Sequence, residues 1–499
     1  MSLFSDIALG FSVALAMDNL FYCAIGVLMG TLIGVLPGIG PLAAISMLLP
    51  LTYNIDAVGA LIMLSGIYYG AQYGGSTTAI LVNVPGESSS VVTALDGYKL
   101  ARKGKAGTAL AIAALGSFFA GSVATLLIAV LAKPLTLVGQ TFGAAEYFSL
   151  MVLGLIVAVI LARGTLIKAL AMVVIGLMLG AIGTDVETGA SRMTLGLPDL
   201  WDGVDVLALA IGLFALAEVG RTLAQPADDV VPVAKVGSLY PSREDLAKSA
   251  KPVIRGTILG SLLGLLPGGG AVLSSFVSYA VEKRISRNPA AFGHGAIEGV
   301  AGPEAANNAG AQTSFIPMLT LGLPANPILA LLLGAMIIHG IQPGWNIVNK
   351  QPDLFWGLIA SMWIGNAMLV IINLPLIGLW IRLLSIPYWV LGPTIVLLCA
   401  FGILGTSNSA FAIQLAAMFA FAGYVLERLE FEPAPLILGF ILSPMLEENF
   451  RRALQFADGD FTTFFTRPIS LAFLVVGTIM LLVGLLPAIT RRRRDVFTE

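Results

Sequence analysis

Long apolar stretches separated by short polar segments occupy nearly the whole chain. Asp, Glu, Lys and Arg are absent from residues 19–55, 57–86, 106–132, 305–349, 354–381 and 383–426. A membrane-spanning helix needs about 20 apolar residues, so several of these stretches are long enough to cross a bilayer more than once. The pattern predicts an all-α integral membrane protein with about 10–14 membrane segments, some of them broken or re-entrant.

Two apolar stretches are interrupted by proline and glycine in the same way. The first interruption is 37–41 (Pro-Gly-Ile-Gly-Pro), and the second is 267–270 (Pro-Gly-Gly-Gly). The apolar arms on either side are short for a complete crossing, and both flanks are expected on one side of the membrane. The two segments are therefore predicted to be re-entrant hairpins with their tips at 37–41 and 267–270.

These hairpins belong to an internal repeat. Residues 30–40 match residues 260–270 at seven of eleven positions. More loosely, residues 74–78 followed by 83–85 resemble 310–314 followed by 322–324. The expected organisation is a first membrane repeat (1–225), a polar cytoplasmic linker (226–251) and a second membrane repeat (252–499).

The charges around the hairpins predict how the repeats are oriented. Residues 52–56 contain no basic residue, whereas the equivalent loop 282–287 contains three; the next loops show the opposite bias, with four basic residues in 99–105. Because basic loops stay in the cytoplasm, equivalent loops are expected on opposite faces, as in an inverted-topology repeat. The N-terminus is expected in the periplasm, and the basic C-terminus (Arg491–Arg494) in the cytoplasm.

Composition agrees with a membrane protein and excludes other classes. Hydrophobic residues make up 57% of the 499 residues, charged residues only 11%, and the mean hydropathy is +0.91. Basic stripes for nucleic acid, a GxxxxGK[ST] phosphate loop and an HExxH motif are absent from the sequence, so an enzyme or direct ATP drive is not expected. No cofactor is expected. Cys23 and Cys399 lie in apolar segments and are expected to be buried free thiols. No cleavable signal peptide is expected.

The hairpin tips are candidate binding elements. Proline lacks an N–H and glycine accepts positive φ, so such a tip can expose backbone amides and carbonyls to a ligand. Alternatively, the glycines only permit close helix packing. The substrate-binding candidates at the tips are Gly38, Ile39, Gly40, Gly268, Gly269 and Gly270.

Polar residues gather before a Pro-containing break in both halves. Hydroxyls and amides can bind a carboxylate, and carbonyls freed at a helix break can bind Na⁺. Alternatively, these side chains bond back onto their own helices. The substrate-binding candidates are Ser76, Thr77, Thr78, Asn83, Asn307, Asn308, Thr313 and Ser314. The cation-binding candidates are Pro85, Gly86, Thr320, Gly322 and Pro324; no metal other than a Na⁺ ion is expected.

Three acidic residues lie near apolar segments and could relay protons or bind cations: Glu146, Glu218 and Glu304. A helix-end position at the membrane interface is an equally good interpretation of Glu146 and Glu218. His294 is expected in a loop, and His339 at a segment end.

Several motifs together resemble the large membrane subunit of tripartite tricarboxylate transporters, the TctA-type family. They are residues 36–41, 73–76, 95–98, 303–309, 320–324 and 466–470. The resemblance covers nearly the whole chain. It implies an inner-membrane permease that works with a small membrane subunit of the four-helix type and a periplasmic solute-binding protein, and that takes up citrate-like or other carboxylates with a coupling ion, Na⁺ or H⁺.

Two other functions remain open on sequence grounds. Broken helices and paired hairpins also build passive channels, and a membrane scaffold without a transport path is a third possibility. The matching polar clusters weigh against the scaffold. The expected surroundings are membrane lipid and an organic carboxylate, without nucleic acid.

Overall fold

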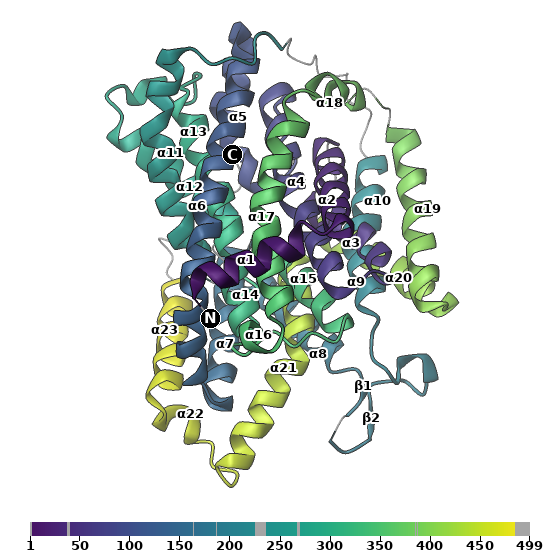
Figure 1. Ribbon diagram of the computed structural model, residues 1–499. Coiled ribbons are helices and arrows are strands. Elements are labelled where there is room, and N and C mark those ends of the chain that lie inside the picture. Colours follow the sequence, from purple (N-terminus) through teal and green to yellow (C-terminus); the bar gives the residue numbers. More distant parts are fainter. Residues whose placement is uncertain are drawn as a thin grey trace.

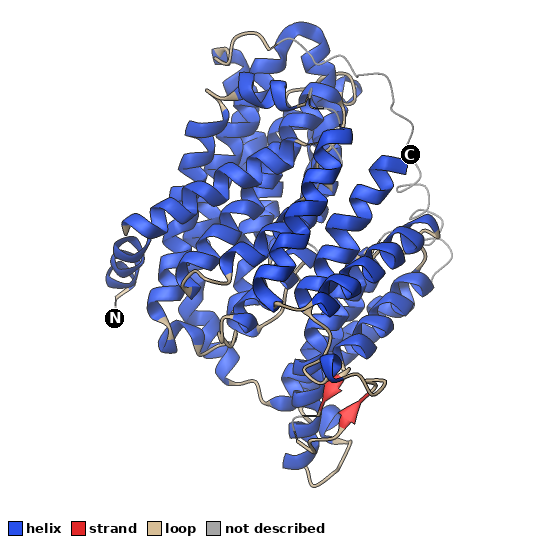
Figure 2. Cartoon of the chain, turned by 90° about the vertical axis from the view of Figure 1, so that its right-hand side faces the viewer, coloured by secondary structure: helices blue, strands red, loops and turns tan. Residues whose placement is uncertain are grey.

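The computed structural model describes residues 2–36, 40–162, 164–185, 187–224, 236–266, 270–384, 386 and 388–484. Helices run along the long axis of the molecule, and the pair of two-residue strands β1 (Gly183–Thr184) and β2 (Ser191–Arg192) lies at its lower end (Figures 1 and 2). The expected all-α class is confirmed for the described residues.

The first half of the chain contains ten α-helices and five shorter turns of 3₁₀ or π-helix among its described residues. In chain order they are α1 (Leu3–Ala14), α2 (Met17–Val35), α3 (Pro41–Leu48), η1 (Leu49–Thr52), α4 (Ala57–Val82), η2 (Ser88–Ser90), α5 (Val91–Leu100), η3 (Ala101–Lys105), α6 (Ala106–Gln140), α7 (Ala144–Leu161), α8 (Leu166–Gly180), η4 (Pro198–Leu200), α9 (Val206–Ala210), η5 (Ile211–Leu216) and α10 (Ala217–Ala224).

The second half has a comparable series. It comprises α11 (Arg243–Gly264), α12 (Gly270–Ile285), η6 (Pro289–Ala291), α13 (Glu298–Thr313), α14 (Phe315–Leu321), α15 (Pro327–Ile338), α16 (Ile347–Lys350), α17 (Pro352–Asn373), α18 (Ile377–Leu383), α19 (Tyr388–Ser407), α20 (Ala410–Arg428), α21 (Ala434–Phe456), α22 (Thr463–Thr466) and α23 (Pro468–Gly484). Helix α11 already begins inside the expected linker 226–251, of which residues 226–235 lie outside the described residues.

Seven helical segments of the described residues are long and apolar enough to cross a membrane, and five shorter apolar helices accompany them. The short ones include η1 joined to α3, α8, α15 and α23. Their lengths fit the expectation of broken segments, because 10–17 residues at 1.5 Å each do not span the roughly 30 Å of hydrocarbon.

Glycines at every fourth position hold the hairpins against their neighbours. In the first half, Cβ atoms on Gly26, Gly30 and Gly34 of α2 would overlap the carbonyl oxygens of Met63, Ile67 and Ala71 of α4. In the second half, Cβ atoms on Gly256, Gly260 and Gly264 of α11 would overlap the carbonyl oxygens of Gly302, Ala306 and Gly310 of α13. Small residues let helix backbones approach closely in membranes. The same packing therefore occurs twice, with first-half and second-half partners 230 residues apart in the hairpin and 239 apart in the facing helix.

The spacing of 239 residues also relates the two helix breaks. Helix α4 ends at Asn83 (φ 58°) and α14 ends at Gly322 (φ 70°), so both residues adopt the left-handed conformation. Pro85 and Pro324 follow two residues later, and Glu87 and Asn326 then occupy the N-cap positions of η2 and α15. The sequence comparison instead aligned Gly74 with Gly310; the packing pairs Gly310 with Ala71, three residues earlier.

Loops that follow the two hairpins contact different ends of the molecule. After α12, the backbone N–H groups of Gly293, Gly295 and Ala296 donate to the buried Asp96 carboxylate of α5 at 2.7–2.9 Å. After η1, by contrast, Thr52 and Tyr53 line a small cavity with His339 and Leu207. In Figure 1, α5 leads to the top, whereas the strands lie at the bottom.

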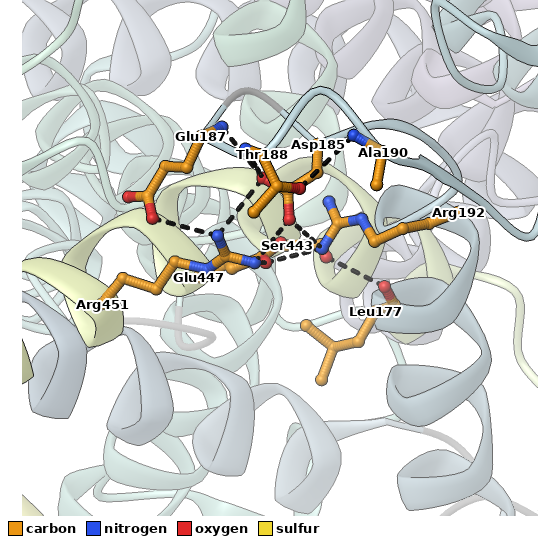
Figure 3. Close-up of polar contacts among 9 residues, drawn as sticks. All are labelled: Leu177, Asp185, Glu187, Thr188, Ala190, Arg192, Ser443, Glu447 and Arg451. Carbon is orange, nitrogen blue, oxygen red and sulfur yellow. Dashed lines mark hydrogen bonds and ion pairs between the residues drawn. The ribbon is translucent and has the colours of Figure 1, made fainter.

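A cluster of ion pairs fixes the strand pair to α21 (Figure 3). Arg451 donates to Asp185 Oδ2 at 2.7 Å and to Glu187 at 3.1 Å, and Arg192 donates to Glu447 at 2.6 Å. The hydrogen bonds from Arg451 lower the pKa of Asp185 to about 2. This cluster holds the loop between α8 and α9 onto the end of α21.

Candidate functional site

A buried carboxylate, Glu304 of α13, lies where the first break meets the second half of the chain. Glu304 is 1% exposed. The Ser76 hydroxyl of α4 donates to both of its carboxylate oxygens at 2.9 Å, and the Thr93 hydroxyl of α5 donates to one of them. An ionisable side chain deep in a membrane protein is costly and usually functional.

A second carboxylate lies next to the first. Glu87, in the break after α4, accepts a hydrogen bond from the Ser89 hydroxyl and another from Asn307 Nδ2 at 3.3 Å. Asn307 is fully buried, and its Oδ1 atom has no hydrogen-bond partner among the described residues. The break and α13 are therefore joined by polar contacts between the two halves.

A cavity opens beside Glu304, with about 310 Å³ of atom-free space including its mouth. Its polar lining residues are Tyr73, Ser76, Thr77, Ser117, Glu304 and Asn373. Asn308 borders this region: its amide donates to Ser117 Oγ at 2.7 Å and to the Glu304 carbonyl at 3.0 Å. The site thus offers hydroxyl and carboxylate oxygens in a mainly apolar wall.

The second break makes the matching contact with the first half. Asn326 Nδ2 donates to the Tyr68 hydroxyl of α4 at 3.0 Å. Asn326 and Tyr68 are the repeat partners of Glu87 and Asn307, because 239 residues separate the members of each pair. The two contacts between halves therefore repeat, with a carboxylate in one and an amide in its place in the other.

The remaining polar candidates bond mostly to their own helices, which was the alternative interpretation. Thr77 donates to the Tyr73 carbonyl, Thr78 to Gly75, Thr313 to Ala309 and Thr320 to Ile316. Ser314 donates to Gly310 and also to Gly264 of α11. Among the predicted hydroxyls, Ser76 is the one that reaches Glu304 and Thr77 lines the cavity.

The hairpin tips approach the breaks. A Cβ at Gly40 would lie 3.7 Å from the Gly86 carbonyl, and one at Gly270 would lie 3.3 Å from Asn326 Nδ2. Gly86 packs against the backbone of Gly75 and Gly34, which leaves no room for a side chain. Gly38, Ile39, Gly268 and Gly269 lie outside the described residues.

Two of the other acidic candidates form helix-end contacts. Glu146 caps α7 through the Gly143 N–H at 2.8 Å and pairs with Arg467, while Glu218 pairs with Arg221. The His294 carbonyl accepts from Lys103 Nζ in a loop, and His339 is the C-cap of α15. Cys23 and Cys399 are buried free thiols, as expected.

Glu87, Thr93, Ser117, Tyr68 and Asn326 were not among the sequence candidates. A detectable signal existed for two of them, since Glu87 and Asn326 both follow a proline by two residues at matching breaks. Thr93, Ser117 and Tyr68 have no local signal, because their role depends on partners far away in the chain. Among the described residues, no three His, Cys, Asp or Glu side chains gather as a metal site.

Comparisons with known proteins agree with the membrane fold. A sequence model of the "Tripartite tricarboxylate transporter TctA family" matches residues 20–438. An Agrobacterium vitis protein described as "Uncharacterized 52.8 kDa protein in TAR-I ttuC' 3'region" is 56% identical over 499 residues, covering 100% of this chain and 99% of the relative. A second one, "Uncharacterized protein in TAR-II ttuC' 3'region", is 57% identical over 240 residues, covering 48% of this chain and 99% of the relative. No solved structure matches. The chain belongs to the tripartite tricarboxylate transporter TctA family.

Proposed function

We propose that this chain is the permease subunit of a binding-protein-dependent secondary transporter, which imports a tricarboxylate or related organic carboxylate with Na⁺ or H⁺. The observation that carries the proposal is the repeated contact between halves, Glu87 with Asn307 and Asn326 with Tyr68. Two broken helices that meet at buried polar groups are the recurring site of secondary transporters. Family membership adds the substrate class and the expected partners.

Inverted-topology repeats fit this function, because rocking of two such halves exposes a central site alternately to each side. Their support is that the loop after α12 contacts α5, whereas the loop after η1 lies beside His339. The basic residues of 99–105 and 283–287 would then lie at one end of the molecule, which the positive-inside rule assigns to the cytoplasm of an inner-membrane protein.

Reconstitution in proteoliposomes tests the proposal. The chain would be inserted with its small membrane subunit, and uptake of labelled citrate and other carboxylates would be measured with and without the solute-binding protein. Uptake should require the binding protein and an imposed Na⁺ or proton gradient, without ATP. Uptake that survives collapse of both gradients and stops on ATP depletion would refute the coupling.

A carboxylate channel or a carrier without a binding protein is the second candidate, because paired hairpins also build pores. Counterflow separates the possibilities. Unlabelled substrate inside the vesicles should drive uptake of labelled substrate through a carrier, whereas a channel shows no such exchange.

A further inference from the structure

The acidic site at Glu304 has no acidic partner in the other half of the chain. The 239-residue spacing that relates the two breaks pairs Glu304 with Ser65, Ser76 with Phe315 and Thr93 with Leu332. Phe315 packs against Tyr68 with ring centroids 6.2 Å apart. One half therefore presents a carboxylate with two hydroxyls, while the matching place in the other half holds one hydroxyl and apolar side chains.

Burial makes an uncompensated charge at Glu304 unfavourable. Glu304 is 1% exposed, and its printed ion pairs and hydrogen bonds come from Ser76 and Thr93, which are neutral. Hydroxyl donors stabilise a carboxylate, but they do not neutralise it. Among the described residues, no Lys or Arg forms a salt bridge with Glu304 or Glu87. A small cation would supply the missing positive charge.

Oxygen atoms suited to such a cation face the same cavity. Tyr73 lines the cavity with Glu304, is only 9% exposed, and its hydroxyl has no hydrogen-bond partner among the described residues. The Asn307 Oδ1 atom, buried next to Glu87, is likewise without a partner there. Hard cations prefer oxygen ligands of this kind. These two unpartnered polar groups are an observation independent of the carboxylates.

We propose that the Glu304 carboxylate, with the hydroxyls of Ser76 and Thr93, binds the single coupling cation of this half of the permease, a sodium ion or a proton. The site is single because its repeat partner, around Ser65 and Phe315, contains no carboxylate. This inference rests on the proposed function, and it names the residue at which the cation acts. Both sources of positive charge would use the same carboxylate oxygens.

Cation binding can be measured on the purified full-length chain without any carboxylate substrate. Thermal unfolding, followed by the fluorescence of its six tryptophans, would be recorded in NaCl and in choline chloride at equal ionic strength, and over a pH series. A ligand that binds only the folded state raises the unfolding temperature. The variants are Glu304→Gln, Thr93→Val and, as matched control at the repeat partner, Ser65→Ala.

The sodium arm predicts that NaCl raises the unfolding temperature of the wild type and of Ser65→Ala, but not of Glu304→Gln. The proton arm predicts no effect of NaCl, together with a rise on acidification that Glu304→Gln lacks. Thr93→Val should remain folded and raise the half-saturating cation concentration about tenfold. Either arm supports the inference.

The inference is overturned if Glu304→Gln responds to cations as the wild type does, or if neither NaCl nor pH acts through Glu304. If Glu304→Gln does not fold, unchanged cation affinity in Thr93→Val has the same consequence. Failure of the proposed function would look different: cation binding could be normal while proteoliposomes take up no carboxylate.

Discussion

Gly40 and Gly270 begin equivalent helices at the two hairpin tips, yet a side chain would be received differently at each. Gly270 has φ +36°, in the left-handed region, and a Cβ there would lie 3.3 Å from Asn326 Nδ2. Gly40 has φ −73°, and its nearest neighbour would be 3.7 Å away. Left-handed backbone costs an L-residue about 1–2 kcal/mol.

Gly270→Ala is therefore expected to lower the free energy of unfolding by about 1–2 kcal/mol and to reduce transport, because Asn326 must shift. Gly40→Ala should change stability by less than about 0.5 kcal/mol. Membrane abundance, thermal unfolding and uptake of the two variants would be compared. Equal effects would show that the tip conformations do not decide transport.

Asp185 makes a pH-dependent contribution to stability outside the membrane segments. The hydrogen bonds from Arg451 lower its pKa from 3.8 to about 2. Because the folded state holds this carboxylate ionised more strongly than the unfolded state does, the stabilisation is present above about pH 4 and is lost as pH falls towards 2. Asp185→Asn should unfold at a lower temperature than the wild type at pH 6. The difference should shrink below about pH 4 in thermal unfolding; a constant difference down to pH 2 would contradict the assignment.

At the residue scale, sequence patterns could predict which polar residues lie in the membrane but not which of them pair. Ser76 was a candidate because it precedes a Pro-containing break, and it does lie at the buried acid. Its partner Glu304 is 228 residues away, and no local pattern specifies a contact over that separation. The same limit applies to Thr93.

At the scale of the helices, two glycine series determine how the hairpins pack. The sequence predicted the tips and the breaks, because proline and glycine have strong local effects. The glycines at every fourth position of α2 and α11 were equally visible, but their role depends on which helix lies opposite. The shift of three residues between the predicted and observed alignments has the same cause: Gly310 contacts Gly264 of α11, just as Ala71 contacts Gly34 of α2.

Alanine at Gly30 or Gly260 should damage both halves to a similar extent. Each Cβ would overlap a backbone carbonyl, of Ile67 or of Ala306, and backbone cannot rotate away as a side chain can. Overpacking of this kind costs about 1–3 kcal/mol. Gly405→Ala in α19 is the control, because no atom lies within 4 Å of its Cβ position. Membrane abundance and thermal unfolding should fall for the first two and not for the control; normal folding of either packing variant would refute the close approach.

At the scale of the whole molecule, the charged loops and the contacts between halves lead to one orientation. The loop after α12 meets α5 through Asp96, and Lys103 Nζ donates to the His294 carbonyl at 2.6 Å. Basic residues from both halves thereby approach one another. Since basic loops stay in the cytoplasm, this end of the molecule is expected there, and the strand pair with its ion-pair cluster in the periplasm.

Single-cysteine labelling checks this orientation with positions that are repeat partners. Tyr53 and Lys283 are 230 residues apart, are both exposed, and follow equivalent hairpins; Arg102 is an exposed residue of the basic loop. The natural thiols Cys23 and Cys399 are buried, so their background reaction with an impermeant maleimide should be low. In intact spheroplasts, Tyr53→Cys should react, whereas Lys283→Cys and Arg102→Cys should react only in inverted vesicles. Reaction of Tyr53→Cys and Lys283→Cys from the same side would mean that the halves are related by a parallel arrangement, and alternating access by inverted repeats would then have to be abandoned for this chain.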